Sequence, residues 1–123
     1  MENHHHPKSR NTGALVTSTA TGASGTVLYT CPAKNKGEVH LLTISNPKTV
    51  SISVTVEVYN SQAGDYYKVV DTFGVEPNSI LYVVNNEDKI FLNPADKIIV
   101  SASIGSNLTS YIAVRETYGE ALA

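Results

Sequence analysis

Residues 50–59 read VSISVTVEVY, and this stretch decides the fold class. Every second residue from Val50 to Val58 is aliphatic, and the residues between them are Ser, Thr or Glu. Successive side chains of a β-strand point to opposite faces, so the alternation places the aliphatic side chains on one face. A helix would scatter the same side chains around its circumference. The stretch therefore predicts a β-strand with one buried face.

Similar apolar runs continue on both sides of this strand. In residues 108–116, Leu108, Ile112 and Val114 share one face. Turn-forming Gly, Pro, Asn and Asp residues separate the runs, for example at Asn46 and Pro47. The strands that we expect cover residues 26–31, 38–45, 50–59, 66–73, 79–84, 89–92, 97–104 and 108–116.

These strands, about eight in number, define the architecture that we expect. Each strand has one apolar face, and no segment between them has the periodicity of a long amphipathic helix. Two antiparallel sheets packed face to face would bury such faces, and so would a closed barrel. Of these two, we favour an all-β antiparallel sandwich.

The composition of the chain changes near residue 25. Residues 1–24 are mostly polar or small, and Leu15 and Val16 form their one apolar pair. We therefore expect an extended N-terminal arm over residues 1–24, a β-sandwich domain over 25–118 and a C-terminal tail over 119–123. Because the arm has no regular core positions, its deletion is expected to leave the sandwich folded.

Bulk composition excludes several classes of function. The chain has 123 residues, enough for one domain, and is 41% hydrophobic and 16% charged, as a folded protein should be. A net charge of −2 gives no basic field to attract nucleic acid or an anionic membrane. Cys31 is the only cysteine, so an internal disulfide is impossible and folding in a reducing cytoplasm is expected. No apolar run reaches the roughly 18 residues of a membrane span.

The residues that could carry chemistry form no catalytic or cofactor site. Cys31 precedes Pro32 without a nucleophile motif, and we expect it to be a small buried core residue. The acidic residues are scattered, and no phosphate-binding loop is present. His4, His5 and His6 lie in the expected arm without fixed geometry, so no metal site is expected there. His40 stands alone in a strand and is expected to be partly buried or at an interface. We expect no enzymatic activity and no cofactor.

Tyrosine is the more informative residue type. The chain has seven Tyr and no Trp, and Tyr buries area while keeping a hydroxyl group for hydrogen bonds. We expect the surface aromatics Tyr66, Tyr67 and Tyr111 to bind a partner. An alternative is a carbohydrate-binding module in which Tyr66, Tyr67 and Asp65 form a platform for a sugar. A module of this kind without Trp is the weaker hypothesis.

Four phrases resemble small structural proteins of tailed bacteriophage virions. They are GTVLYTCPA at residues 25–33, YYKVV at 66–70, VEPNSILYVV at 75–84 and IFLNPADKIIVSAS at 90–103. The resemblance implies a jelly-roll-like sandwich that serves as a capsid cement, or decoration, protein. A neck, tail, baseplate or fibre adaptor is the alternative within the same class. Residues 92–98 also resemble a turn of trimeric tumour-necrosis-factor-like jelly rolls, although Ala95 stands where those domains usually have Gly.

The resemblance also implies how the chain would work. The sandwich would sit on the capsid, and the arm would reach neighbouring subunits through Lys8, Arg10, Leu15 and Val16. The implied partners are the major capsid protein or other virion proteins and further copies of the chain, with neither nucleic acid nor membrane and with glycan as a minor option. The implied location is the virion, assembled in the host cytoplasm.

Overall fold

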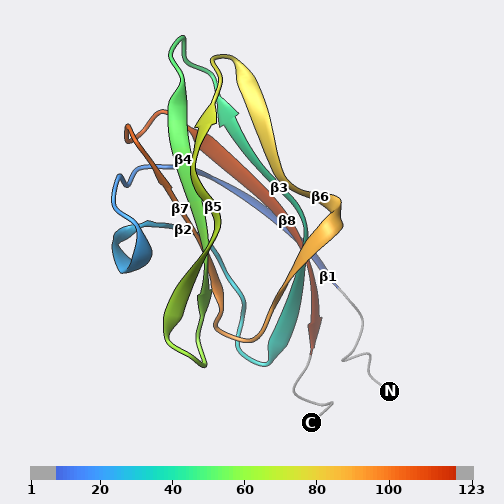
Figure 1. Ribbon diagram of the computed structural model, residues 1–123. Coiled ribbons are helices and arrows are strands. Elements are labelled where there is room, and N and C mark those ends of the chain that lie inside the picture. Colours follow the sequence, from blue (N-terminus) through green and yellow to red (C-terminus); the bar gives the residue numbers. More distant parts are fainter. Residues whose placement is uncertain (1–7, 119–123) are drawn as a thin grey trace.

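The computed structural model describes residues 8–118, the side chains of residues 86 and 87 excepted (Figure 1). This part of the chain contains one short 3-10 turn, η1 (Gly22–Ser24), and no helix that could cross a bilayer. The remaining elements are strands, which confirms the predicted all-β class. They are β1 (Lys8–Leu15), β2 (Thr26–Thr30), β3 (Asn35–Asn46), β4 (Ile52–Asn60), β5 (Asp65–Val75), β6 (Ser79–Leu92), β7 (Lys97–Ala102) and β8 (Thr109–Tyr118).

Two four-stranded sheets pack face to face, as Figure 1 shows. The β1 sheet has the order β1-β8-β3-β6, and the β4 sheet has the order β2-β7-β4-β5. All pairings are antiparallel, and the chain passes from one sheet to the other at most of its connections. Eight strands arranged in this order form a jelly roll. The predicted sandwich is therefore confirmed.

The core lies between the sheets and is built from the alternating rows. Val54 and Val56 of β4 are fully buried, as the alternation predicts. Val50 departs from the prediction, because β4 begins at Ile52 and Val50 is 53% exposed in the preceding turn. Cys31 is buried, which confirms its expected place in the core. The largest fully buried aliphatic side chains of this core are Leu42, Ile44, Ile52, Leu92, Ile98, Leu108 and Ile112.

Two of the predicted strands, 79–84 and 89–92, are parts of a single strand, β6. The turn residues at Asn85 and Asn86 do not end the strand. They begin a bulge, since Asn85 pairs with Leu41 and Ile90 pairs with Val39. The advance of five residues from Asn85 to Ile90 on β6 thus lies opposite an advance of only two residues on β3. The ladder resumes beyond the inserted residues, and a bulge of this kind is indistinguishable from a turn in the sequence.

The predicted N-terminal arm is wrong for residues 8–24. Lys8–Leu15 forms the edge strand β1 and pairs with β8 over eight residues. Val16 follows it and is fully buried in the core, so it is not a partner-binding residue of an arm. Backbone hydrogen bonds hold an edge strand in place, and most side chains of β1 are exposed, so its sequence can be polar. The predicted arm residues 1–7 and the predicted tail residues 119–123 lie outside the described part.

The connection from β1 to β2 covers part of the outer surface of the β4 sheet. The amide of Ala102 donates to Ser18 O, and the amide of Gly22 donates to Glu57 Oε1 at 2.8 Å. Ile99 points away from the core, yet it is only 1% exposed beneath this segment. A Cβ at Gly25 would lie 2.4 Å from Ile99 Cγ2, so only glycine allows this close approach. The chain itself thus partly covers this sheet (Figure 1).

Candidate interaction surface

No segment within residues 8–118 covers the outer face of the β1 sheet in this way; the outer face is the side directed away from the core. The register places Tyr82 of β6 and Tyr111 of β8 on either side of Thr43 of β3. The next row along the strands holds Ile80 and, on β1, Leu15. Tyr82 is 58% exposed, and the other three large side chains are exposed as well. The centre of this face therefore offers an aromatic and aliphatic patch to a partner.

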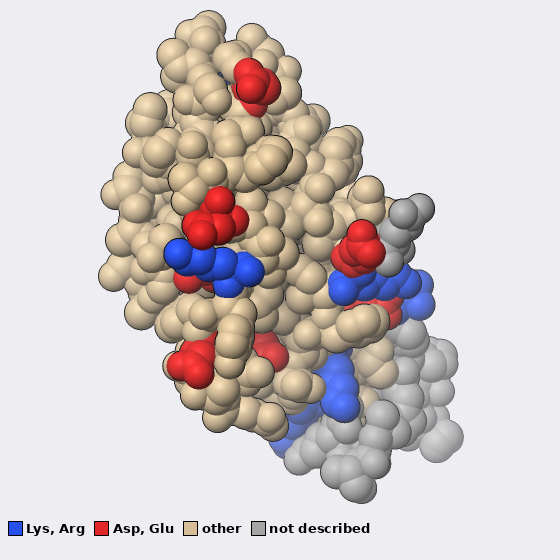
Figure 2. All heavy atoms as spheres, viewed as in Figure 1, with Lys and Arg blue, Asp and Glu red and all other residues tan. Residues whose placement is uncertain are grey.

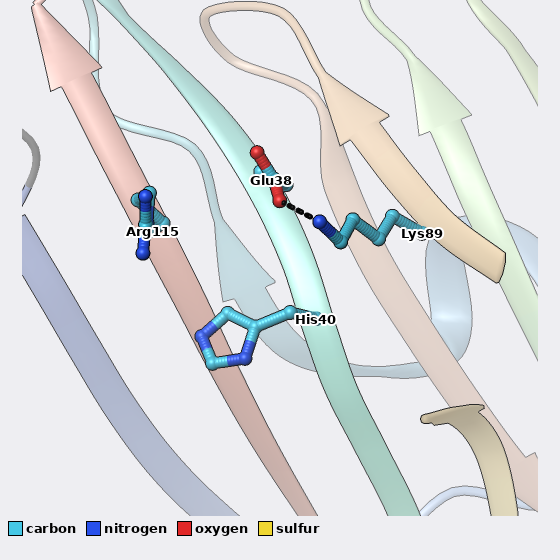
Figure 3. A pocket seen from close by; sticks show the side chains of 4 residues that line it. All are labelled: Glu38, His40, Lys89 and Arg115. Atoms are coloured by element: carbon cyan, nitrogen blue, oxygen red, sulfur yellow. Dashed lines mark ion pairs between the residues drawn. The ribbon is translucent and has the colours of Figure 1, made fainter. Parts of the chain in front are cut away.

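An ionic cluster lies on the same face, nearer the other end of the strands. Lys89 Nζ is 2.8 Å from Glu38 Oε2, and His40 and Arg115 line the same shallow hollow of about 200 Å³ (Figure 3). The hydrogen bond from Lys89 holds the pKa of Glu38 below its ordinary value, and the charges of Lys89 and Arg115 act in the same direction. Three basic side chains thus share this hollow with a single carboxylate.

Pairing and bulges bring this cluster together. Glu38 lies opposite Arg115 of β8 on one side and opposite Phe91 of β6 on the other. Lys89 belongs to the bulge of β6, and a second bulge in β3 occurs at His40. Phe91 is the most exposed large apolar side chain described, at 72%. The outer face therefore combines the hydrophobic patch with the ionic cluster, and the exposed ring of Phe91 lies beside that cluster.

Charged side chains elsewhere are sparse. Figure 2 shows small, separated groups of Lys, Arg, Asp and Glu on the face in view, whose other described residues are uncharged. Lys68 Nζ and Asp71 Oδ1, for example, are 3.7 Å apart, and both side chains are exposed. Exposed pairs of this kind contribute little to stability. Such a surface suits association through packing and hydrogen bonds better than through a strong electrostatic field.

A buried carboxylate closes one end of the core. Glu116 of β8 is 2% exposed, accepts a hydrogen bond from Tyr29 Oη, and lies 2.9 Å from Arg10 Nε through its Oε2. Its Oε1 has no hydrogen-bond partner among the described residues. Burial, and then the hydrogen bond to Glu116, hold the pKa of Tyr29 above its ordinary value. Arg10 therefore fastens β1 to the sandwich through its Nε, while its side chain stays 56% exposed.

Cys31 lies close to this carboxylate, and its thiol is unreactive. Burial raises the pKa of Cys31 to about 11, and the negative charge of Glu116 adds to this effect. The thiolate is the reactive form of cysteine, so a buried thiol with this pKa presents no nucleophile at neutral pH. Within residues 8–118 no three His, Cys, Asp or Glu residues are placed to hold a metal ion. His4, His5 and His6 lie outside the described residues.

The structure separates the three aromatic residues predicted to bind a partner. Tyr66 and Tyr67 are neighbours on β5, so their side chains point to opposite faces. Tyr66 is half-buried against Tyr59, with ring centroids 4.7 Å apart, whereas Tyr67 is exposed at the sheet edge. Tyr111 belongs to the other sheet. A sugar platform built from Tyr66 and Tyr67 together therefore has no geometric basis.

Of the predicted arm residues, Lys8, Arg10 and Leu15 are exposed, and Arg10 is also paired with Glu116. Leu15 shares the outer face of the β1 sheet with Tyr111. Ile80, Tyr82, Phe91 and the ion pair between Glu38 and Lys89 were not predicted from the sequence. Alternation within residues 79–84 could have indicated that Ile80 and Tyr82 share a face. Nothing in the sequence indicates that this face is the uncovered one.

No protein-family model and no curated protein matches the chain. Among solved structures, the chain is similar to a chain of the T13 IBDV viral particle, described in connection with icosahedral virus evolution. The TM-score is 0.52 and the sequence identity 13%, over 95% of this chain and 33% of that chain. At this identity the similarity establishes the fold alone, and the chain spans about a third of the viral protein that it matches.

Proposed function

We propose that the chain is a non-enzymatic structural protein of a virion that acts as a capsid cement, or decoration, protein. The observation that carries the proposal is the uncovered outer face of the β1 sheet, with Tyr82 and Tyr111 at its centre. The shared fold with a chain of an icosahedral viral particle supports the virion context. Because one fold hosts many functions, the surface is the stronger support.

The proposed mechanism differs from the arm predicted from the sequence. The rigid outer face packs on the shell, with the aromatic and aliphatic patch at the centre of the contact and the Glu38 cluster towards its rim. Tyr82 and Tyr111 bury ring area and keep hydroxyl groups for hydrogen bonds. Arg115 and Lys89 meet acidic groups on the shell, and this part of the contact weakens as salt is added.

Repetition on a lattice compensates for the small size of each contact. Burial of one large apolar side chain contributes about 1.5 to 3 kcal/mol, and ordering and association costs oppose it. A single copy of this sandwich therefore binds weakly. A shell offers many equivalent positions, and copies that also contact one another bind with a much higher overall affinity.

The proposed partners are the major capsid protein or other virion proteins, together with further copies of the chain. The proposed location is the virion, assembled in the host cytoplasm, and the lone buried cysteine is compatible with folding there. The small net charge of −2 supports neither nucleic acid nor membrane as a partner.

The test compares virions that carry wild-type protein, the double variant Tyr82→Asp/Tyr111→Asp, or the control Val50→Asp. Val50 is exposed but lies in the turn before β4, away from the outer face. We expect both variants to fold, and we expect quantitative mass spectrometry of purified particles to find at least tenfold less of the double variant only. Equal incorporation of all three proteins, or absence of the wild-type protein from particles, contradicts the proposal.

Cryo-electron microscopy of the same particles separates the two virion roles. Density for the sandwich over the whole shell supports the cement role. A single ring of copies at one vertex supports a neck or tail adaptor and rejects the cement role.

A further inference from the structure

The four edge strands of the sandwich differ in regularity. The β2, β5 and β6 strands each pair with their neighbour through register shifts, which mark bulges. The β1 strand pairs with β8 over all eight residues of Lys8–Leu15 without a shift. Bulges protect sheet edges from pairing with other chains. The free edge of β1 is therefore the one regular edge among the described strands.

Alternation along β1 identifies the backbone groups on this free edge. Val16 donates its amide proton to Leu108 O at 2.8 Å, so Val16 and Leu108 form a hydrogen-bonded pair. In an antiparallel ladder such pairs alternate with pairs whose N–H and C=O groups point away from each other. The groups that point to the free edge are those of Ser9, Asn11, Gly13 and Leu15. No described residue bonds to the backbone of these four.

We propose that β1 pairs antiparallel with β1 of a second copy of the chain, about a two-fold axis at Thr12. The two β1 sheets then form one continuous eight-stranded sheet. In this register Ser9 lies opposite Leu15 of the second copy, and Asn11 lies opposite Gly13. On each strand, the four residues whose N–H and C=O groups point to the free edge thereby gain backbone hydrogen-bond partners.

The side chains of β1 are compatible with this register. Arg10 lies opposite Ala14 of the second copy, and Lys8 lies opposite Val16, so no like charges face each other. A register centred on Arg10 would instead place the two Arg10 side chains in direct opposition, which is unfavourable. A register centred on Asn11 would pair the free-edge backbone groups of only three residues on each strand. The register centred on Thr12 therefore satisfies the most backbone groups without repulsion.

Two further observations favour a second copy as the occupant. A two-fold contact needs a self-complementary surface, and Lys8–Leu15 meets that requirement in both pairing and charge. The seam also carries apolar surface, because a Cβ at Gly13 would lie 3.6 Å from Tyr111 Cδ1, so this ring lies beside the edge. Pairing would join the outer faces of the two copies. Dimerisation through β1 does not require that the protein is part of a virion.

A strand edge of eight residues is smaller than a standard protein interface, so the dimer should be weak. Sedimentation equilibrium over a wide concentration range is therefore the suitable measurement. It compares the wild type with Asn11→Pro and with the control Asn11→Ala. Proline at residue 11 removes the outward N–H and places its ring in the seam without removing a β1–β8 hydrogen bond. Alanine removes the same exposed side chain and keeps the N–H.

We expect the wild type and Asn11→Ala to dimerise at high concentration, and Asn11→Pro to dimerise at least tenfold more weakly with an unchanged melting temperature. Cross-linking provides a second measurement in case proline perturbs β1. Thr12→Cys places two thiols face to face across the axis, within the Cα separation that a disulfide requires. Lys8→Cys leaves its thiols about 26 Å apart, at about 3.3 Å per residue.

Oxidised dimers of Thr12→Cys but not of Lys8→Cys support the proposal. A wild type that stays monomeric at every concentration overturns it. Equal dimerisation of wild type and Asn11→Pro, or equal cross-linking of the two cysteine variants, overturns it as well.

Discussion

Asp96 illustrates how single side chains organise the turns of this sandwich. Its buried carboxylate accepts hydrogen bonds from the amide of Asn93 at 2.9 Å and from the amide and hydroxyl of Ser61 at 2.9 and 3.0 Å. Its backbone oxygen accepts from the amide of Cys31. One residue thus connects the β6–β7 turn, the β4–β5 turn and the end of β2. Such satisfied buried networks specify a unique arrangement of the chain.

Ala95, next to Asp96, has the backbone conformation that glycine prefers. Its φ is 72°, in the left-handed region, where a Cβ costs about 1 kcal/mol or more. We expect Ala95→Gly to raise the free energy of unfolding by about 0.5 to 1 kcal/mol, because relief of this strain exceeds the added entropy of the unfolded chain. Urea denaturation is the measurement. Ala102→Gly, in the buried part of β7, is the control and should destabilise the protein; a loss of stability in both variants would contradict the expectation.

Cys31 makes stability depend on pH in the alkaline range. Its pKa is raised from 9.0 to about 11 in the folded protein, so the unfolded chain loses the thiol proton first as pH rises. The contribution of Cys31 is therefore complete below pH 9 and is lost as pH approaches 11. The difference corresponds to about 2 to 3 kcal/mol, at about 1.4 kcal/mol per pKa unit.

The measurement is urea denaturation of wild type and Cys31→Ala at several pH values from 7 to 11. Alanine removes the thiol, so the variant should lose less stability across this range than the wild type. Tyr29, whose pKa is also raised, contributes a decline of the same sign in both proteins at the highest pH. Parallel pH profiles for the two proteins would show that the thiol is not responsible.

At the scale of elements, β1 has two distinct roles at its C-terminal end. Leu15 points to the outer face and is 46% exposed, whereas Val16 is fully buried between the sheets. The amide and carbonyl of Val16 also bond to Leu108 and Ser106, which ties the end of β1 to the turn before β8. Adjacent apolar residues thus serve surface and core respectively.

This division predicts opposite outcomes for two neighbouring substitutions. Val16→Asp places an unpaired charge in the core and should abolish cooperative folding, because such burial costs several kcal/mol. Leu15→Asp should change the melting temperature little, since the carboxylate remains in solvent. Circular dichroism melts of both variants provide the comparison. A stable Val16→Asp protein would mean that β1 is not part of the sandwich, as the arm hypothesis supposed.

At the scale of the whole molecule, the two ends of the described chain lie side by side. Lys8–Leu15 pairs with residues 109–116, and Arg10 contacts Glu116 across 106 positions of sequence. The final described strand, β8, also lies in the middle of the β1 sheet, between β1 and β3. The sheet is therefore complete only when β8 has joined it.

This topology predicts slow folding. Long-range pairs must close large loops before their contacts form, and all-β domains of this kind refold in roughly milliseconds to seconds. We expect stopped-flow refolding from urea to fall in that range. Arg10→Ala, which removes a contact between the two ends, should mainly speed unfolding if β1 joins after the transition state. Refolding in microseconds would contradict the role of these long-range pairs.

Much of the fold was predictable from local pattern. The alternation around Val54 and Val56 indicated strands with one buried face, and Cys31 was correctly expected in the core. Such predictions succeed because the period of two reports directly which side chains share a face. The left-handed Ala95 shows the limit of this approach, since an alanine gives no local signal for that conformation.

The all-β class and most of the strands follow from the local side-chain pattern. Three features emerge only from long-range contacts: β1 belongs to the sheet, β6 continues through its bulge, and Tyr82 and Tyr111 share an exposed outer face. The physical reason is that an edge strand or a bulge is held by backbone hydrogen bonds to residues far away in sequence. These bonds are made by the backbone N–H and C=O groups that all residues except proline carry, so no side-chain pattern predicts them.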